Sequence, residues 1–236
     1  MIGFREPGYL WKLDIPFIYG PIGGLSFYSK KLMFNSGLYI FVYSFFYNLI
    51  RFFDIRFNNR SKLAFKKARN FILASNSDTK NNLEKYFQMK SKLFLPVACE
   101  KEINFKKKNK KINKQINLFW GGLHIPRKSL NIALDALSRL PKYIDWKLHI
   151  TGTGKMTNEW KELSIKKNIE KRCNFYGYLK NKEDLPKIMK KCDINLFTSI
   201  KEDTPAIIME TMSLGLPTIC FDLYGAKDLV NNKRGV

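Results

Sequence analysis

The sequence predicts an α/β fold built on parallel sheets, and two observations support that prediction. Residues 193–222 read as strand, loop, helix and strand, which together make one parallel crossover unit. Short apolar runs, of the length expected for buried parallel strands, also recur along the chain and are followed by turn or helix-capping residues. With 236 residues, of which 45% are hydrophobic, the chain can form one large packed domain or two small ones.

The crossover unit carries a sequence signal at each boundary. Ile194–Phe197 predicts a buried strand, and Thr218–Phe221 predicts a second. Between them, Thr204 suits the N-cap of a helix, and Pro205 suits the first helical position, where its missing N–H costs nothing. Gly215 stands where a left-handed residue ends a helix. We therefore expect a helix that begins at Pro205 and ends before Gly215.

Two glutamates flank the start of this helix. Glu202 lies in the loop at the carboxyl end of the strand, where doubly wound sheets bind ligands. Glu210 lies on the helix, about 8 Å beyond its capped end at the usual helical rise. The helix N-terminus between them suits a diphosphate, and each carboxylate can accept hydrogen bonds from sugar hydroxyls. The same spacing also fits two solvated glutamates on a surface loop and helix.

The segment EDTPAIIME, from Glu202 to Glu210, is a Glu-x7-Glu pattern, and GLP follows it. It resembles the donor-site motif of retaining glycosyltransferases of family 4. The resemblance runs from about Leu93 to the end of the chain and more weakly through the first hundred residues. It implies the GT-B fold, with a complete or nearly complete C-terminal Rossmann-like domain and a partial N-terminal one.

The resemblance implies transfer of a sugar, with retention, from a nucleotide diphosphate sugar to a lipid-linked or polysaccharide acceptor. In such an enzyme Glu210 would hold the ribose hydroxyls, and Glu202 would contact the hexose and stabilise positive charge at the anomeric carbon. Lys128 and the helix end at Thr204 would offset charge on the departing diphosphate. No Asp-x-Asp metal pair occurs, so we expect neither a metal nor a cofactor. The other donor-binding candidates in this segment are Asp203, Pro205 and Ala206.

The net charge of +22, from 42 Lys and Arg against 20 Asp and Glu, implies an anionic partner. That partner could be nucleic acid, a membrane surface or a phosphorylated substrate. Because no nucleic-acid-binding motif is visible, we expect no nucleic acid partner. Four cysteines without metal-ligand spacing indicate free thiols in a reducing compartment; they are Cys99, Cys173, Cys192 and Cys220.

The first residues, MIGFREPGYLWKLD, carry charges and lack the apolar region of a signal peptide. We therefore expect a cytoplasmic protein with peripheral contact to the inner face of an anionic membrane. The nineteen uncharged residues Leu32–Ile50, rich in Phe and Tyr, are just long enough to span a membrane. Polar interruptions and flanking cations favour instead a partly buried helix whose aromatic side lies on the membrane surface. An ordinary core helix remains an alternative.

Residues 1–99 are expected to form the partial, acceptor-side domain. Ile15–Tyr19 predicts a strand, and the glycines of the GPIGG sequence after it permit a tight turn and close backbone approach to a ligand. Part of the family carries a similar loop facing the cleft, which makes Gly23 and Gly24 donor-binding candidates. Further strands are expected at Phe71–Ala74 and Leu93–Val97, with a helix capped within Ser75–Asp78 between them.

Residues 100–115 are polar and dense in lysine, as in a solvated linker. Residues 116–236 are expected to form the nucleotide-sugar-binding domain, beginning with a strand at Ile116–Trp120. The GGLHIPRKS sequence follows, and its glycine turn with two cations before a helix suits a phosphate. Lys128 matches a lysine of the family motif, whereas Gly122 replaces its arginine and Arg127 is a candidate substitute. An exposed basic loop is the alternative.

Two more strands are expected at Trp146–Thr151 and Asn174–Gly177. In the family, the turn after the first lines the donor pocket, and the residues after the second border the nucleotide base. Those positions are Gly152, Tyr178 and Leu179.

Two histidines lie in this half of the chain. His149, within a strand, is expected to be a satisfied core or surface group, and His124 lies where it could donate to an oxyanion.

Relatives usually extend further at both ends, so the chain is expected to be a truncated reading frame or part of a split enzyme. Three alternatives remain: a non-catalytic remnant that binds nucleotide sugar, a nucleotide-sugar epimerase of the same fold, and a basic nucleic-acid-binding protein.

Overall fold

The computed structural model describes residues 2–35, 37–68, 71–98, 115–181 and 183–230. Contacts divide the chain into two compact units. The first unit comprises residues 1–97, 201–205 and 222–228, and the second comprises residues 98–200, 206–221 and 229–236. Two short segments of the predicted C-terminal domain therefore pack with the first unit.

The first unit contains a parallel sheet whose strands follow one another in chain order. They are β1 (Ile2–Gly3), β2 (Tyr19–Gly23), β3 (Ile72–Ala74) and β4 (Lys92–Leu93). Its helical elements are η1 (Leu10–Lys12), α1 (Lys30–Asn35), α2 (Leu38–Phe57), α3 (Asn59–Ala68), α4 (Ser77–Phe87) and α9 (Tyr224–Leu229), the last grouped here through Asp228. The core of this unit is rich in aromatic rings, and Phe4, Tyr19 and Phe65 are buried in it.

The strand predicted at Ile15–Tyr19 is wrong in position, because β2 starts at Tyr19 and continues through Gly23. Ile15 and Ile18 are 54% and 64% exposed, so this apolar run does not enter the core. The first four residues of the GPIGG sequence belong to the strand, and Gly24, with a φ of +78°, follows it. Glycine is needed at position 20 because a Cβ there would lie 2.4 Å from the carbonyl oxygen of Leu73 on β3. The strand predicted at Leu93–Val97 is likewise shorter, since β4 ends at Leu93.

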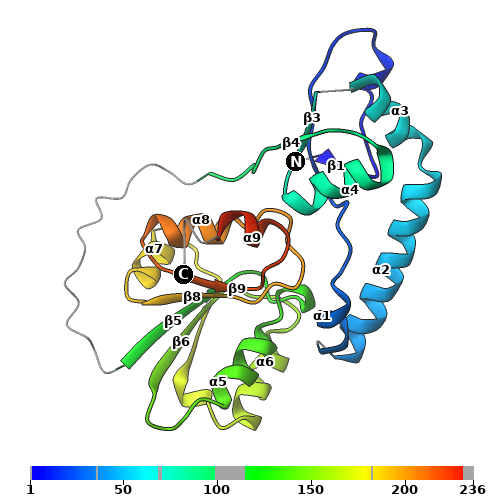
Figure 1. The fold of residues 1–236 in the computed structure, drawn as a ribbon. Helices are drawn as coiled ribbons and strands as arrows, with labels where there is room; N and C mark the ends of the chain where they lie inside the picture. Colours follow the sequence, from blue (N-terminus) through cyan, green and yellow to red (C-terminus); the bar gives the residue numbers. More distant parts are fainter. Residues whose placement is uncertain (1, 36, 69–70, 99–114, 182, 231–236) are drawn as a thin grey trace. The chain divides into compact units, whose positions relative to one another are not determined.

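The apolar stretch predicted as one helix at Leu32–Ile50 forms two. α1 ends at Asn35, and α2 begins at Leu38 after Gly37, whose φ of +92° suits a residue without a side chain. α2 then continues past Arg51 to Phe57 as the longest helix of this unit (Figure 1). By length and composition alone, α2 would be able to cross a membrane. Only 17% of the residues in its most apolar window are buried in the protein.

The helix predicted after Phe71–Ala74 is confirmed. Asn76 is the N-cap of α4, and its side-chain oxygen accepts a hydrogen bond from the backbone N–H of Thr79 at 2.8 Å.

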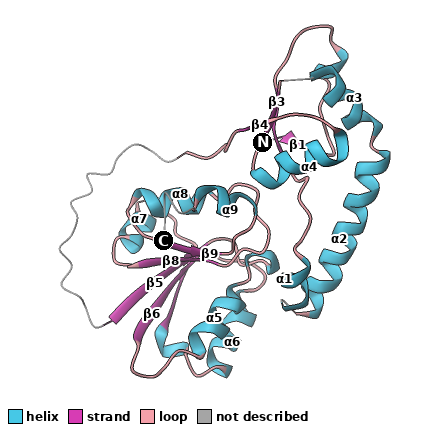
Figure 2. Cartoon of the chain, viewed as in Figure 1, coloured by secondary structure: helices cyan, strands magenta, loops and turns pink. Residues whose placement is uncertain are grey.

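The second unit contains a five-stranded parallel sheet, magenta in Figure 2. Its strand order is β7 (Cys173–Gly177), β6 (Asp145–Thr151), β5 (Gln115–Gly121), β8 (Ile194–Phe197) and β9 (Thr218–Cys220). The chain runs outward from β5 first to one side and then to the other, so a topological switch point lies between β5 and β8. All five strands fall within one residue of their predicted bounds at each end.

Helices cover both faces of this sheet (Figure 1). They are η2 (Pro126–Lys128), α5 (Leu130–Ser138), α6 (Thr157–Lys166), η3 (Glu170–Arg172), α7 (Asp184–Met189) and α8 (Ala206–Ser213). Alternate residues of β5 point to opposite faces, as the pleat requires. Leu118 and Trp120 pack in the cluster that includes residues of α5 and α6, whereas Phe119 packs in the cluster with residues of α7.

The predicted linker lies largely outside the described residues. Residues 100–114 and Cys99 are not described, and Gln115 already belongs to β5. Of the three other cysteines, Cys173 and Cys192 are buried and Cys220 is half-buried.

Candidate donor-binding site

The loops that leave the carboxyl ends of β5, β6 and β7 surround a cavity of about 780 Å³ in the second unit. Five of the predicted donor-binding residues line this cavity: Gly122, Gly152, Tyr178, Leu179 and Glu210. The volume is in the range of small-molecule sites, and the position at the carboxyl edge is where open α/β sheets bind ligands. The structure therefore brings these five residues together around one cavity, and their binding of a donor stays a prediction.

The loops beside the cavity approach one another at positions that only glycine permits. Gly152 has a φ of +105°, and a Cβ there would lie 2.0 Å from the carbonyl oxygen of Gly122. A Cβ on Gly154 would similarly lie 2.5 Å from the carbonyl oxygen of His124. The Gly152 N–H also donates to the Gly177 carbonyl at 2.8 Å. The three loops are thus held together by direct contact between their backbones.

Glu210 extends from α8 into the lining of this cavity. Burial alone raises the pKa of its carboxyl above the ordinary value of 4.5, because neither a hydrogen bond nor a neighbouring charge contributes to the shift. A half-buried acid without a compensating partner opposes folding when it is ionised. An ionisable group that opposes folding in this way is typical of binding and catalytic sites.

We expect the variant Glu210→Gln to be more stable than the natural chain at pH 7. The pKa of Glu210 is raised in the folded state, so the folded state holds this proton more tightly than the unfolded state does. The resulting contribution to the free energy of unfolding is fully present below pH 4.5 and is lost as the pH rises through the folded-state pKa. The amide cannot ionise and avoids that loss. Urea unfolding across this pH range measures the difference, which should vanish in acid. A variant that is less stable at pH 7, or a difference independent of pH, would contradict the assignment.

Lys128 is positioned by the 3₁₀ helix η2. The Thr198 hydroxyl, which follows β8, donates to the Lys128 carbonyl at 2.9 Å, and the Ile200 N–H donates to the Arg127 carbonyl at 2.9 Å. The end of the Lys128 side chain lies against Gly122, where a Cβ would be 3.8 Å from its Nζ. Its ammonium group therefore lies beside Gly122, which lines the cavity, whereas Lys128 is not itself one of the lining residues. Gly122, at the family's arginine position, has a φ of +153°, which side chains rarely adopt.

The start of α8 differs slightly from the prediction. The helix begins at Ala206, so Pro205 immediately precedes it and Thr204 does not stand at the expected N-cap position. Propensity rules place helix ends only to within a residue or two. The predicted end is confirmed, because Gly215 has a φ of +68° and its N–H bonds the Met212 carbonyl at 2.9 Å.

The other half of the predicted site belongs to the first unit. Gly23 and Gly24 lie there, and so do Glu202, Asp203, Thr204 and Pro205. Asp203 and Gly24 contact each other: the Gly24 N–H donates to Asp203 Oδ2 at 2.6 Å. Asn76 Nδ2 donates to Asp203 Oδ1 at 3.3 Å, so the carboxylate joins two segments of this unit. Asp203 thus has a structural role here that the donor-binding prediction did not include.

Lys201 is a buried cation that the sequence analysis missed. It is 9% exposed, its ammonium donates to the Ser26 carbonyl at 2.8 Å, and three tyrosine rings surround it. The rings are Tyr28, Tyr47 and Tyr224, whose centroids lie 5.4, 5.2 and 4.9 Å from its Nζ. Cation–π contacts of this kind compensate partly for lost hydration. No spacing rule predicts them, because the rings come from distant parts of the sequence.

The two histidines are packing residues. His149 is satisfied as expected, by the Tyr176 hydroxyl at 2.8 Å and the Asn117 side chain at 3.1 Å. His124 does not fit the suggested role as an oxyanion donor, because it is 1% exposed and its Nδ1 bonds the Thr157 hydroxyl. Burial lowers the pKa of His124, which favours the neutral ring.

Several cavity residues escaped the sequence analysis because they are ordinary apolar residues of helices and loops. The missed residues include Leu123, Leu185, Pro186, Met189, Ile207 and Leu214. The only available signal was their place on the helices and loops next to the carboxyl ends of the strands.

Residues 100–236 match the family model of glycosyl transferases group 1. A stretch of 94 residues is 32% identical to an uncharacterized glycosyltransferase of Haemophilus influenzae and covers 39% of this chain and 26% of the relative. A stretch of 85 residues is 33% identical to the Escherichia coli UDP-Gal:alpha-D-GlcNAc-diphosphoundecaprenol alpha-1,3-galactosyltransferase, covering 36% and 21%.

Among solved structures, the fold is similar to the apo form of the lipopolysaccharide outer core galactosyltransferase WaaB. The TM-score is 0.61 with 23% identity, covering 75% of this chain and 50% of that one. Anabaena Alr3699/HepE in complex with UDP is similar with a TM-score of 0.56 and 19% identity, covering 75% and 52%. These likenesses confirm the predicted α/β fold of the GT-B type. The chain spans about a quarter of the length of the curated relatives and about half of the solved structures.

Proposed function

The chain belongs to the glycosyl transferases group 1 family, and on that premise we propose that it transfers a sugar from a nucleotide diphosphate sugar to an acceptor with retention of configuration. The observation that carries the proposal is the cavity at the carboxyl edge of the second sheet, where Glu210 is half-buried and has no compensating partner among the residues that the structure describes. Solved relatives of similar fold are described as complexes with UDP and with UDP-glucose, which supports a donor of this class.

In this proposal the donor's nucleoside lies in the cavity of the second unit. The Glu210 carboxylate accepts hydrogen bonds from the ribose hydroxyls, and the base lies beside Tyr178 and Leu179. Gly122 and Gly152 line the cavity without side chains, so the diphosphate can approach their backbone closely. The Lys128 ammonium beside Gly122 is in position to offset phosphate charge.

The chemistry needs electrostatic stabilisation more than a protein nucleophile. The acceptor hydroxyl oxygen bonds to the anomeric carbon while the bond to the diphosphate oxygen breaks, releasing a nucleoside diphosphate and a proton. Lys128 stabilises the departing diphosphate, and Glu202 is proposed to stabilise the positive charge that develops at the anomeric carbon. Arg127 and the start of α8 at Ala206 add further positive potential.

The acceptor in this proposal is a lipid-linked or polysaccharide glycan, including the lipopolysaccharide type. Two relatives support that class, one described as acting on a diphosphoundecaprenol-linked sugar and one as a lipopolysaccharide core enzyme. A lipid-linked acceptor also requires the enzyme to reach a membrane, which agrees with the net charge of +22.

The test combines donor binding with product analysis. Calorimetric titration with UDP and GDP should give saturable binding of one of them to the natural chain. Incubation with the matching sugar nucleotides and a polyprenyl-diphosphate sugar should then yield a glycoside with the donor's anomeric configuration, read by NMR. A free epimer would identify an epimerase instead. Binding of neither nucleotide would overturn the proposed donor site.

A further inference from the structure

The longest helix of the first unit, α2, turns its polar side chains toward the protein. Its inward stripe includes Ser44, Asn48 and Arg51, of which Ser44 and Arg51 are buried. Asn48 holds the backbone of Tyr28 through two hydrogen bonds, at 2.8 Å to its N–H and 3.2 Å to its carbonyl. Arg51 donates to the Tyr47 hydroxyl at 2.7 Å and lies 3.5 Å from Asp54. The two Asn48 hydrogen bonds, and the Phe4 ring 5.5 Å from the Arg51 guanidinium, fix which face of the helix is inside.

The outer face of α2 is correspondingly apolar. Eleven large apolar side chains of this helix are at least 41% exposed: Leu38, Tyr39, Val42, Tyr43, Phe45, Phe46, Leu49, Ile50, Phe52, Phe53 and Phe57. A helix on the surface of a soluble domain has the opposite arrangement, with its apolar stripe inside. At roughly 100 Å² for each half-exposed ring, the seven rings alone expose about 700 Å², above the largest patch of a typical monomer. Water is therefore an unfavourable environment for this face.

Positive charge surrounds the apolar face. Lys30 and Lys31 precede α2, and Arg56 and Arg60 stand at its other end, all four exposed. Residues 1–97 contain 15 Lys and Arg against 5 Asp and Glu, a net charge of +10. The partner that complements both properties is apolar below a layer of negative charge, which describes an anionic bilayer.

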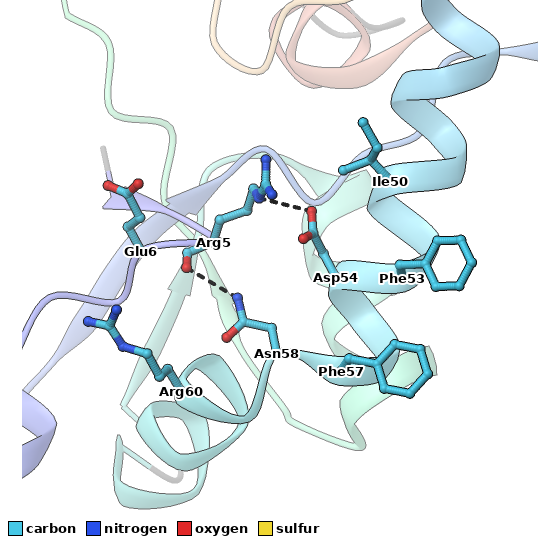
Figure 3. Close-up of a pocket in the computed structure, with 8 residues that line it drawn as sticks. All are labelled: Arg5, Glu6, Ile50, Phe53, Asp54, Phe57, Asn58 and Arg60. Carbon is cyan, nitrogen blue, oxygen red and sulfur yellow. Dashed lines mark hydrogen bonds and ion pairs between the residues drawn. The ribbon is translucent and has the colours of Figure 1, made fainter.

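The C-terminal end of α2 shows the border of this face (Figure 3). A hollow of about 710 Å³ lies there, and its lining combines Ile50, Phe53 and Phe57 with polar side chains. Figure 3 shows Phe53 and Phe57 pointing away from the ion pair of Arg5 with Asp54, whose atoms are 3.0 Å apart. The hollow also contains Glu6 and Arg60, so its own charges balance and the attraction to anions comes from the wider surface.

We propose that α2 is an in-plane membrane anchor, whose aromatic face lies among the headgroups and upper acyl chains of an anionic bilayer. The proposal deepens the proposed function, on which it rests for the lipid-linked acceptor. α2 does not span the bilayer in this arrangement, because spanning would remove Asn48 from Tyr28 and Asp54 from Arg5, which lie outside the helix. A second copy of the chain fits less well, because two chains of charge +22 repel each other.

Flotation of the full chain with lipid vesicles tests the anchor. We expect binding to phosphatidylcholine vesicles that contain phosphatidylglycerol, weakened by high salt and nearly absent with phosphatidylcholine alone. The double variant Phe46→Glu with Phe53→Glu should lower the bound fraction at least about ten-fold. The matched control, Tyr143→Glu with Ile165→Glu, changes charge equally at exposed positions of the second unit and should bind as the natural chain does.

The exposed arginines at the C-terminal end of α2 provide an independent test of the anchor. Arg56→Gln and Arg60→Gln should each weaken binding about five-fold at low salt, and little at high salt. Lys142→Gln and Lys166→Gln, at exposed sites of the second unit, are the matched pair.

The anchor proposal would be overturned if the Phe46/Phe53 variant floated as the natural chain does. Retention of the natural chain after alkaline carbonate extraction would also overturn it, because it indicates spanning. A natural chain that binds no vesicles but forms a dimer, which this variant abolishes, would overturn it too. Circular dichroism and nucleotide titration of each variant verify that it is folded. Because the donor cavity lies wholly in the second unit, failure of the donor proposal would appear as absent nucleotide binding with flotation intact.

Discussion

Replacing Glu210 or Lys128 by alanine is expected to lower donor turnover by about 10²–10³-fold, the usual cost of removing one preorganised electrostatic contact. Glu210 lines the cavity, and its carboxylate is the only one among the described lining residues. Lys128 brings its ammonium beside Gly122, which lines that cavity. The measurement is release of nucleoside diphosphate from the donor identified by titration, with an acceptor present.

The two variants should differ in a way that a general loss of structure would not produce. Glu210→Ala should weaken binding of the nucleoside diphosphate itself, whereas Lys128→Ala should lower the turnover number more than the donor affinity. Glu162→Ala and Lys166→Ala, on exposed positions of α6, are the matched controls and should keep natural activity. Full activity in either site variant would show that the donor binds elsewhere.

The substitution Gly152→Ala is expected to destabilise the second unit by several kcal/mol, on the order of 3–5. The new Cβ would lie 2.0 Å from the backbone carbonyl of Gly122, and a backbone oxygen cannot move aside as a flexible side chain can. The φ of +105° adds strain for any residue with a side chain. Urea unfolding followed by circular dichroism measures the loss.

Gly177→Ala is the matched comparison for this effect. Gly177 also has a positive φ, +72°, but a Cβ there would meet its nearest neighbour, the Thr153 methyl group, at 3.9 Å. Only the backbone strain applies, so the expected loss is about 1–2 kcal/mol. Equal losses in the two variants would mean that the loop backbones can separate freely, against the close packing described above.

The second unit was predictable because its signals are local and agree with one another. Apolar runs bounded by Gly, Pro and capping residues set the strands to within one residue, and their carboxyl ends identified the edge that holds the cavity. The exact start of α8 was missed because Thr204 and Pro205 both fit helix-start positions on propensity alone.

The first unit was less predictable because its strands are short and depend on long-range pairing. Ile15 and Ile18 look like strand residues, yet β2 forms where Gly20 allows close approach to β3. The contacts of Asp203 with Gly24 and of Lys201 with its tyrosine rings join residues far apart in sequence. The spacing of residues along the sequence does not predict such long-range pairs, so only the structure identifies them.

The glycine contacts between the three loops have a consequence for how donor preference can change. Because backbone contacts hold the three loops together, the cavity side chains Tyr178, Leu123 and Ile207 can be substituted without separating the loops. For the proposed donor, the loop backbone would be preorganised before binding, so little conformational entropy would be lost on association. We therefore expect single substitutions at those three positions to change the selectivity for base or sugar while the backbone of the loops stays the same.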